Sequence, residues 1–260
     1  VHFMAVLGYY KVSPVNGGFS VSLKRSRVVV KVVDGGTVEY TRFLDERPVS
    51  RRLVSLRYER DSIAIHPTPS ISTPRRLTSL ILVKLSTPII LAPRASVEVT
   101  LSIPIDVAVY AYREEDERYR AVDVFNEEGK VKYTLYGRPS DGEICRFHVS
   151  TPTTGFRLQE GSGGLTRASL PLRLVNHTGL WVEVTRALVD SASIDLYFNG
   201  DDQVFTQEVE MHVDSRRTAT VSYGDRPPEG FEVGAFKAIR SWQPPVRTPL
   251  HRRTLMEWGI

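Results

Sequence analysis

Apolar and polar residues alternate along most of the chain with a period of two. In a strand, successive side chains point to opposite faces, so each such run has one buried face and one wet face. This is typical of an antiparallel sheet packed on a core. The clearest runs are Phe19–Leu23, Val28–Val33, Val97–Leu101, Ala168–Val175, Leu180–Val184 and Val204–Val213. We therefore expect an all-β protein, an antiparallel β-sandwich made of two packed sandwich-like units.

Turn residues separate these runs where hairpins are expected. Asp34-Gly35-Gly36 lies between Val28–Val33 and Thr37–Phe43, and Asn199-Gly200-Asp201-Asp202 separates Ile194–Phe198 from Val204–Val213. Such residues tolerate the positive φ angles that tight hairpins need. The charged run 113–118 has no apolar stripe that a helix could bury, so it predicts a solvated loop between two strands.

Two breaks could divide the chain. The stretch 150–155, continued by the glycine-rich 160–164, is rich in small and turn residues. We therefore expect an N-terminal β domain over residues 1–150 and a C-terminal β-sandwich over residues 151–260. The charged run 113–118 is the alternative boundary.

Composition is that of an ordinary globular protein, with 41% apolar and 25% charged residues in 260. Arginine greatly outnumbers lysine, and Cys145 is the single cysteine. The low content of thermolabile residues fits a thermophilic source, although arginine richness equally fits the base composition of a genome. One cysteine excludes an internal disulfide. No run is long and apolar enough for a transmembrane segment, and no signal peptide is recognised, so we expect a cytoplasmic protein.

The charge balance argues against nucleic acid as a partner. The net charge is only +4, from 34 basic and 30 acidic residues. Nucleic-acid binders concentrate basic charge on one face, whereas arginine doublets here are spread along the chain at 51–52, 75–76, 216–217 and 252–253. A protein partner or self-association is the expectation instead.

No residue pattern carries a catalytic or metal signature. The six histidines form no close pair of zinc-ligand spacing, and no Gly-x-Ser-x-Gly elbow is present. We expect no cofactor, no metal and no catalytic residue, and we interpret Cys145, His148 and His212 as structural. Asp106 and Asp123 each lie within an apolar run, where an acid faces solvent, pairs with arginine or serves a site. Carboxylates that converge from distant strands would leave a hydrolase open.

Several stretches together resemble one known family. They are Val122–Phe125, Lys132–Pro139, Gly142–Phe147, the upstream Pro88–Pro93 and the C-terminal Met256–Gly259. They resemble an archaeal family, domain of unknown function number four hundred thirty-two, roughly from Leu7 to the end of the chain. The resemblance implies an archaeal origin and no established activity. The resemblance also implies that some relatives are associated with small mechanosensitive channels, and it would then imply a soluble regulatory or ligand-sensing module.

The most specific binding hypothesis concerns one predicted hairpin. Lys132–Tyr136 and Ile144–Val149 alternate as strands, and residues 137–142 form the turn between them. The turn carries Arg138, Asp141 and Glu143, with Arg146 near its base. Because loops on rigid β scaffolds often carry function, we predict this hairpin tip as the binding surface. The alternative is a salt-bridged turn without function. We expect a non-enzymatic binding or protein-interaction module; the competing hypothesis is a carbohydrate-active or other hydrolase.

Overall fold

The computed structural model describes residues 5–70, 77–158, 164–200, 202–215, 218–231, 234–240 and 253–255. Within them the chain is almost entirely β, as predicted, with two short 3₁₀ turns, η1 (Gly164–Thr166) and η2 (Ser191–Ser193). The strands are β1 (Gly8–Tyr10), β2 (Gly18–Ser22), β3 (Ser26–Asp34), β4 (Thr37–Leu44), β5 (Arg47–Ser55), β6 (Asp61–Pro69), β7 (Leu80–Leu91), β8 (Ser96–Arg113), β9 (Arg118–Phe125), β10 (Lys132–Tyr136), β11 (Glu143–Ser150), β12 (Thr153–Thr154), β13 (Arg167–Asn176), β14 (Val182–Asp190), β15 (Leu196–Phe198), β16 (Val204–Thr206), β17 (Val209–Val213), β18 (Thr218–Tyr223), β19 (Phe236–Lys237) and β20 (Arg253–Leu255).

Three sheets make up the fold. The largest has the order β1-β6-β8-β13-β16-β15-β19, with β9 and β12 also paired to β8 and with β17, β18 and β20 attached through β13. A second sheet has the order β10-β11-β7-β14, and a third has the order β2-β3-β4-β5. Most pairs are antiparallel, but β11 runs parallel to β7, and β16 and β17 run parallel to β13.

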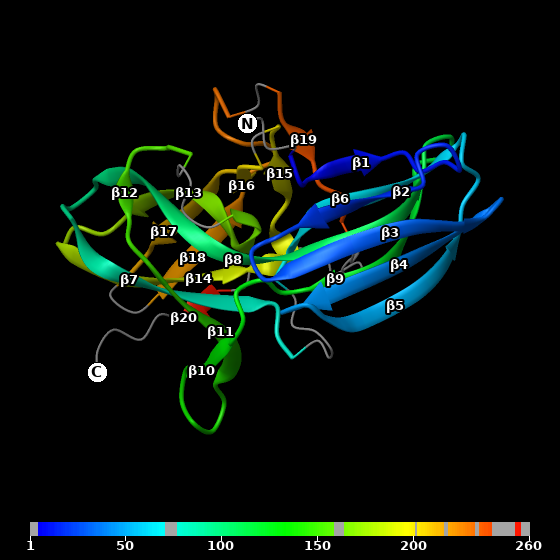
Figure 1. Cartoon of the computed structure of the whole chain (residues 1–260). Helices are drawn as coiled ribbons and strands as arrows, with labels where there is room; N and C mark the ends of the chain where they lie inside the picture. Colours follow the sequence, from blue (N-terminus) through cyan, green and yellow to red (C-terminus); the bar gives the residue numbers. More distant parts are fainter. Residues whose placement is uncertain are drawn as a thin grey trace.

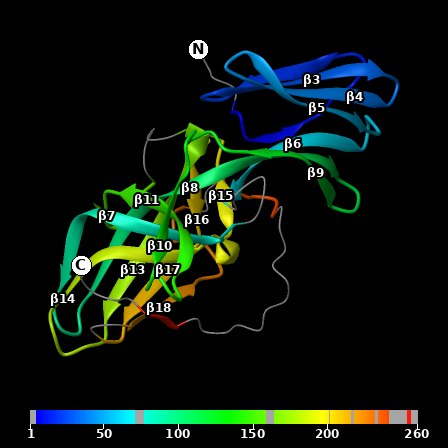
Figure 2. The same ribbon diagram turned by 90° about the horizontal axis from the view of Figure 1, so that it is seen from below.

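The long strand β8 runs through both halves of the molecule (Figure 1). Its first half pairs with β13 from Ser96 to Pro104, and its second half pairs with β6 from Ile105 to Arg113. Strands β1–β6 and β9, with the second half of β8, form what we call the N-terminal lobe. The remaining strands form the second lobe. In the N-terminal lobe, β2–β5 form a layer over β6 and β9 (Figure 2).

One hydrophobic core runs through both lobes. In the second lobe it contains residues of β7 and β14, such as Val83 and Val184, together with Leu101 of β8 and Leu172 of β13. In the N-terminal lobe the same cluster continues through residues such as Val30, which lies on β3. Each lobe thus packs sheet against sheet, and burial of these alternating apolar faces is the main stabilising contribution.

Strands from both sides of residue 150 pair with each other. β7 pairs with β14, and β8 pairs with β13, so the chain after residue 150 completes sheets begun before it. The boundary at residue 150 stays a prediction, as does the alternative at 113–118. The glycine-rich part of the break, residues 160–163, lies outside the described residues.

Two predicted hairpins are confirmed, and one predicted strand is divided. β3 pairs with β4 through the Asp34-Gly35-Gly36 turn, and β15 pairs with β16 across residues 199–202. The charged run 113–118 joins β8 to β9, as the predicted loop between two strands. The run Val204–Val213 instead forms two strands, β16 and β17. Gln207 lies between them, and its amide side chain binds the backbone of Ser193 and Asp195, which ends the regular pairing.

The turn of the β10–β11 hairpin requires glycine at position 142. A Cβ atom there would lie 2.6 Å from the carbonyl oxygen of Arg138 and 2.9 Å from that of Tyr136. We expect Gly142→Ala to lower the free energy of unfolding by about 1–3 kcal/mol, because backbone atoms must move. Gly35→Ala is the matched control, since a Cβ there meets nothing within 4 Å. Urea denaturation of both variants measures the difference; equal stability would contradict the close contact.

Candidate functional site

The β10–β11 hairpin forms as predicted and projects from the body of the molecule (Figure 1). Arg138, Asp141 and Glu143 lie at its tip with exposed side chains. On one face of its two strands lie exposed apolar residues, Tyr133, Leu135 and Ile144, with 41%, 44% and 45% of their surface accessible. The pairing of Leu135 with Ile144 brings two of these side chains together.

Arg146 does not share the tip with the other three predicted residues. It is only 4% exposed, and its guanidinium lies 3.5 Å from Asp106 and 2.9 Å from Glu128. It shares a face with Tyr133 and Ile144 but lies nearer the base of the hairpin, where that face is turned toward β8. There, Ser102 of β8 contacts both His148 and Ser150, which alternate with Arg146 along β11.

These contacts form a buried polar cluster between the lobes, which we call the junction network: Asp106, Asn126, Glu128, Arg146 and His148. The loop after β9 supplies two members. Asn126 donates to Asp106 at 2.8 Å, and Glu128 also lies 3.9 Å from Arg167. Between them, Glu127 accepts from the backbone N–H groups of residues 25 and 26 in the N-terminal lobe. One short loop therefore ties the two lobes together.

Burial controls the ionisation of this network. It raises the pKa of Asp106 to about 6, although Arg146 and Asn126 act in the opposite direction. Burial likewise lowers the pKa of His148 to about 4. At neutral pH, Asp106 is therefore ionised beside a guanidinium, and the imidazole is neutral.

Carboxylates from distant parts of the chain do converge here, but the arrangement favours a structural role. Ser102, His148 and Glu128 stand in the order hydroxyl, imidazole, carboxylate, with distances of 3.2 and 3.8 Å. The second distance, between His148 and Glu128, is too long for a hydrogen bond. Ser102 is 6% exposed, and an imidazole with a pKa of about 4 is a weak base at pH 7. A nucleophilic triad therefore lacks an effective base here, and a substrate has little access to Ser102.

Other residues singled out in the sequence have structural surroundings. Asp123 accepts from Tyr40 and, at 2.8 Å, from Arg42 between the two layers of the N-terminal lobe. Cys145 is fully buried, and burial raises the pKa of its thiol to about 11. His212 bonds to His177 at 2.9 Å. Among the described residues, no group of three acids, histidines or cysteines could hold a metal ion.

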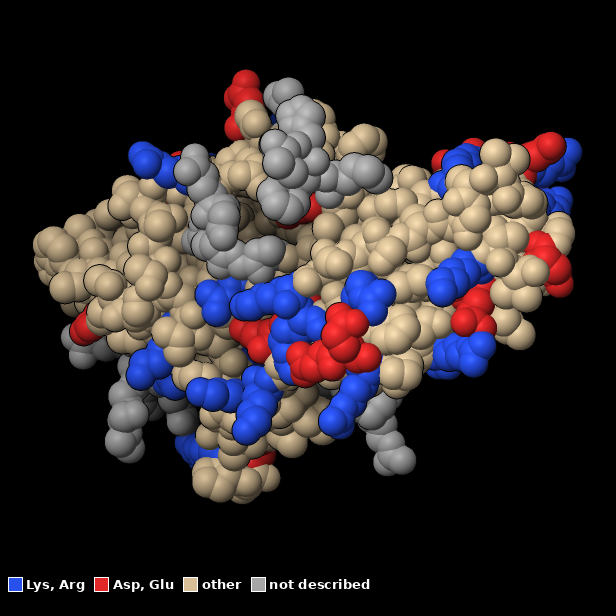
Figure 3. All heavy atoms as spheres, in the orientation of Figure 1, with Lys and Arg blue, Asp and Glu red and all other residues tan. Residues whose placement is uncertain are grey.

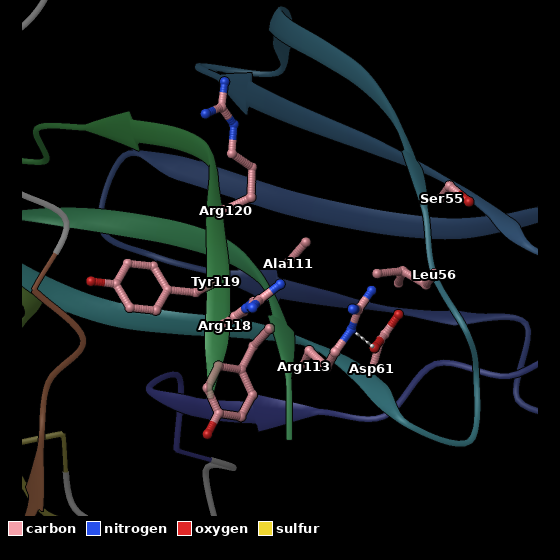
Figure 4. Close-up of a pocket in the computed structure, with 9 residues that line it drawn as sticks. Ser55, Leu56, Asp61, Ala111, Arg113, Arg118, Tyr119 and Arg120 are labelled. Carbon is pink, nitrogen blue, oxygen red and sulfur yellow. Dashed lines mark hydrogen bonds and ion pairs between the residues drawn. The ribbon is translucent and has the colours of Figure 1, made fainter. Parts of the chain in front are cut away.

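An arginine-lined pocket opens between β5 and β9, in the N-terminal lobe (Figure 4). Its volume is about 270 Å³. The lining residues are Ser55, Leu56, Asp61, Ala111, Tyr112, Arg113, Arg118, Tyr119 and Arg120. Pairing of β8 with β9 places Arg113 opposite Arg118 and Ala111 opposite Arg120, so all three arginines lie on one face of this sheet.

The tyrosine rings lie on the other face. Figure 4 shows the ring of Tyr119 turned away from the arginines, and its hydroxyl donates to the carbonyl oxygen of Arg240 at 2.7 Å. The ring of Tyr112 packs against Tyr9, with centroids 4.9 Å apart. This pocket is thus a cationic depression and offers no aromatic stacking platform.

A second, larger pocket of about 460 Å³ lies beside the turn before β6. Its two arginines, Arg57 and Arg60, both pair with Glu115, at 3.4 and 2.7 Å. Their charge is therefore largely neutralised. Neither of these two pockets contains a pair of carboxylates.

Surface charge elsewhere is mixed. Figure 3 shows basic and acidic side chains gathered together in the middle of one face. Of the arginine doublets, 75–76, 216–217 and Arg252 lie outside the described residues. Arg51 and Arg52 are neighbours on β5, so their side chains point to opposite faces.

Sequence reasoning missed Arg113, Arg118 and Arg120 as a group. One signal was present: two strands joined by the short charged run place Arg113 beside Arg118, and Arg118 and Arg120 share a face because they are two residues apart. The sequence does not show that the opposing strand β5 leaves a pocket beside these arginines.

Comparisons with known proteins give a family but no activity. No curated protein and no solved structure matches the chain. No helix in the described part of the chain is long and apolar enough to cross a membrane. A family model described as protein of unknown function, DUF432, matches residues 8–257. This match covers nearly the whole chain, in agreement with the resemblance seen in the sequence, and the protein therefore belongs to the DUF432 family.

Proposed function

We propose that this protein is a non-enzymatic β-sandwich module with a regulatory role, and that it binds a protein partner through the β10–β11 hairpin. The observation that carries the proposal is the projecting hairpin with Tyr133, Leu135 and Ile144 exposed on one face. Clustered exposed apolar residues with charged neighbours are typical of protein-interaction sites. Arg138, Asp141 and Glu143 supply that charged rim.

The free edge of the hairpin supports the same proposal. Among the described strands, β10 pairs only with β11, so its outer edge is open to another strand. β5 is also an edge strand, but Pro48, a bulge near Arg42 and Phe43 and its exposed arginines protect it. A partner that adds a strand would therefore choose β10 over β5.

The internal pairing of ionisable groups supports a non-enzymatic role. Asp106, Glu128 and Arg146 satisfy one another in the junction network, and the two described pockets hold no carboxylate pair. The thermophilic, archaeal and cytoplasmic expectations belong to the same proposal. The thermophilic one rests on the composition and the archaeal one on the family resemblance.

The hairpin is tested by placing a photo-crosslinking residue at position 135 of the full chain. We expect light to yield one adduct of defined mass, either a dimer of this chain or a complex with one other protein. The adduct should fall about tenfold when Tyr133→Ala and Arg138→Glu remove a contact and reverse a charge.

The matched control places the same residue at Val33, which is also exposed and lies on β3. Equal adducts from positions 33 and 135, or no effect of the two substitutions, would contradict binding by the hairpin. Turnover of a glycoside or ester substrate that Glu128→Gln abolishes would contradict the non-enzymatic part.

A further inference from the structure

The pocket between β5 and β9 is a second site, distinct from the hairpin. We propose that it binds the phosphate group of a small phosphorylated ligand. Three arginines line a depression of about 270 Å³, a size that suits a small ligand. Asp61 is the only acid among the lining residues, so the lining carries a net positive charge.

Most of the negative charge near the pocket is already engaged. Asp61 accepts from the backbone N–H of Arg57 at 2.9 Å and lies 3.4 Å from Arg113. In the adjoining loop, Glu114 pairs with Lys11 and Glu115 pairs with Arg57 and Arg60. Glu114 and Glu115 are thus paired with basic residues outside the lining, whereas Asp61 offsets the charge of Arg113 within it.

Arg118 and Arg120 are the two arginines available to bind the ligand. The ion pair of Arg118 with Asp116, at 3.2 Å, is solvent-exposed, and a pair of that kind contributes little and is easily exchanged for a ligand. Arg120 has no acidic partner among the described residues, and it lies two residues farther from the acidic loop. Figure 4 shows the side chain of Arg120 reaching toward the opposite layer, whereas Arg113 is turned toward Asp61.

The charge of the site favours phosphate over carboxylate. A phosphomonoester carries about −1.5 to −2 charges at pH 7, which matches an excess of roughly two guanidinium groups. Guanidinium forks also bind phosphate oxygens in a bidentate manner. Ser55 lines the opposite wall of the pocket.

Isothermal titration calorimetry of the full chain with inorganic phosphate and with O-phosphoserine tests the site, at constant low ionic strength. We expect both to bind and succinate to bind about tenfold more weakly. Arg118→Gln and Arg120→Gln should each weaken phosphate binding by about tenfold or more, because each removes a charged hydrogen bond. Arg47→Gln is the control: it removes the same charge from β5, eight residues or about 26 Å along the strand from Ser55.

Several results would overturn the assignment. These are undetectable phosphate binding, succinate binding as tight as phosphate, or an Arg120→Gln variant that binds like the Arg47→Gln control. The thermal midpoints of the variants show that they are folded. Release of inorganic phosphate from O-phosphoserine would contradict the non-enzymatic function and leave the phosphate site standing, so the two failures are distinguishable.

Discussion

Replacing Arg146 by alanine is expected to lower the free energy of unfolding by about 3–5 kcal/mol, measured by urea denaturation at pH 8. The substitution leaves Asp106 buried without the guanidinium and takes a 2.9 Å partner from Glu128. Removing one member of a buried ion pair costs far more than the pair contributes, because the remaining charge cannot be solvated.

Lys132→Ala is the control for this prediction, since Lys132 is exposed on the neighbouring strand β10. It should change the free energy of unfolding by less than about 0.5 kcal/mol. Adding Asp106→Asn to Arg146→Ala should restore part of the loss, because the buried charge disappears. The loss should also be smaller at pH 5, below the pKa of about 6 for Asp106, where that carboxyl is largely protonated. An Arg146→Ala variant within 1 kcal/mol of the native protein would show that Arg146 is not held in a buried network.

Acid is expected to destabilise the protein through His66. This side chain is fully buried, its Nδ1 accepts from the backbone N–H of residue 239, and aromatic rings of Tyr9 and Phe198 surround it. Burial lowers its pKa from 6.5 to about 4. The unfolded chain therefore takes up a proton first as the pH falls. The stability that neutral His66 contributes is complete above pH 6.5 and is lost as the pH falls through 4, with a total of about 3 kcal/mol.

The measurement is the free energy of unfolding between pH 7 and pH 4. His148 acts in the same direction, while Asp106, whose pKa is raised, acts in the opposite one and costs stability as the pH rises through about 6. His66→Phe isolates the effect of His66, because phenylalanine suits the aromatic surroundings and does not titrate. For this variant, the slope of unfolding free energy against pH should be smaller, by an amount that corresponds to up to one proton taken up on unfolding. An unchanged slope would assign the acid sensitivity to other groups.

Local pattern predicted the fold class because strand alternation and turn chemistry act over a few residues. The β10–β11 hairpin is an example: its alternation and its Gly-containing turn predict both strands and the connection between them. The same local reasoning could not place Arg146, because its position on β11 fixes which side chains share its face but not what that face packs against.

The sequence by itself determined an all-β chain, its principal hairpins, the burial of Cys145 and membership of the DUF432 family. Only the tertiary structure decided that β8 spans both lobes, that Arg146 meets Asp106 and Glu128, and that Arg113, Arg118 and Arg120 line one pocket. The physical reason is range. Backbone preference and alternation are properties of neighbouring residues, whereas ion pairs and pockets depend on which sheet faces are buried against each other, and burial joins residues far apart in the chain.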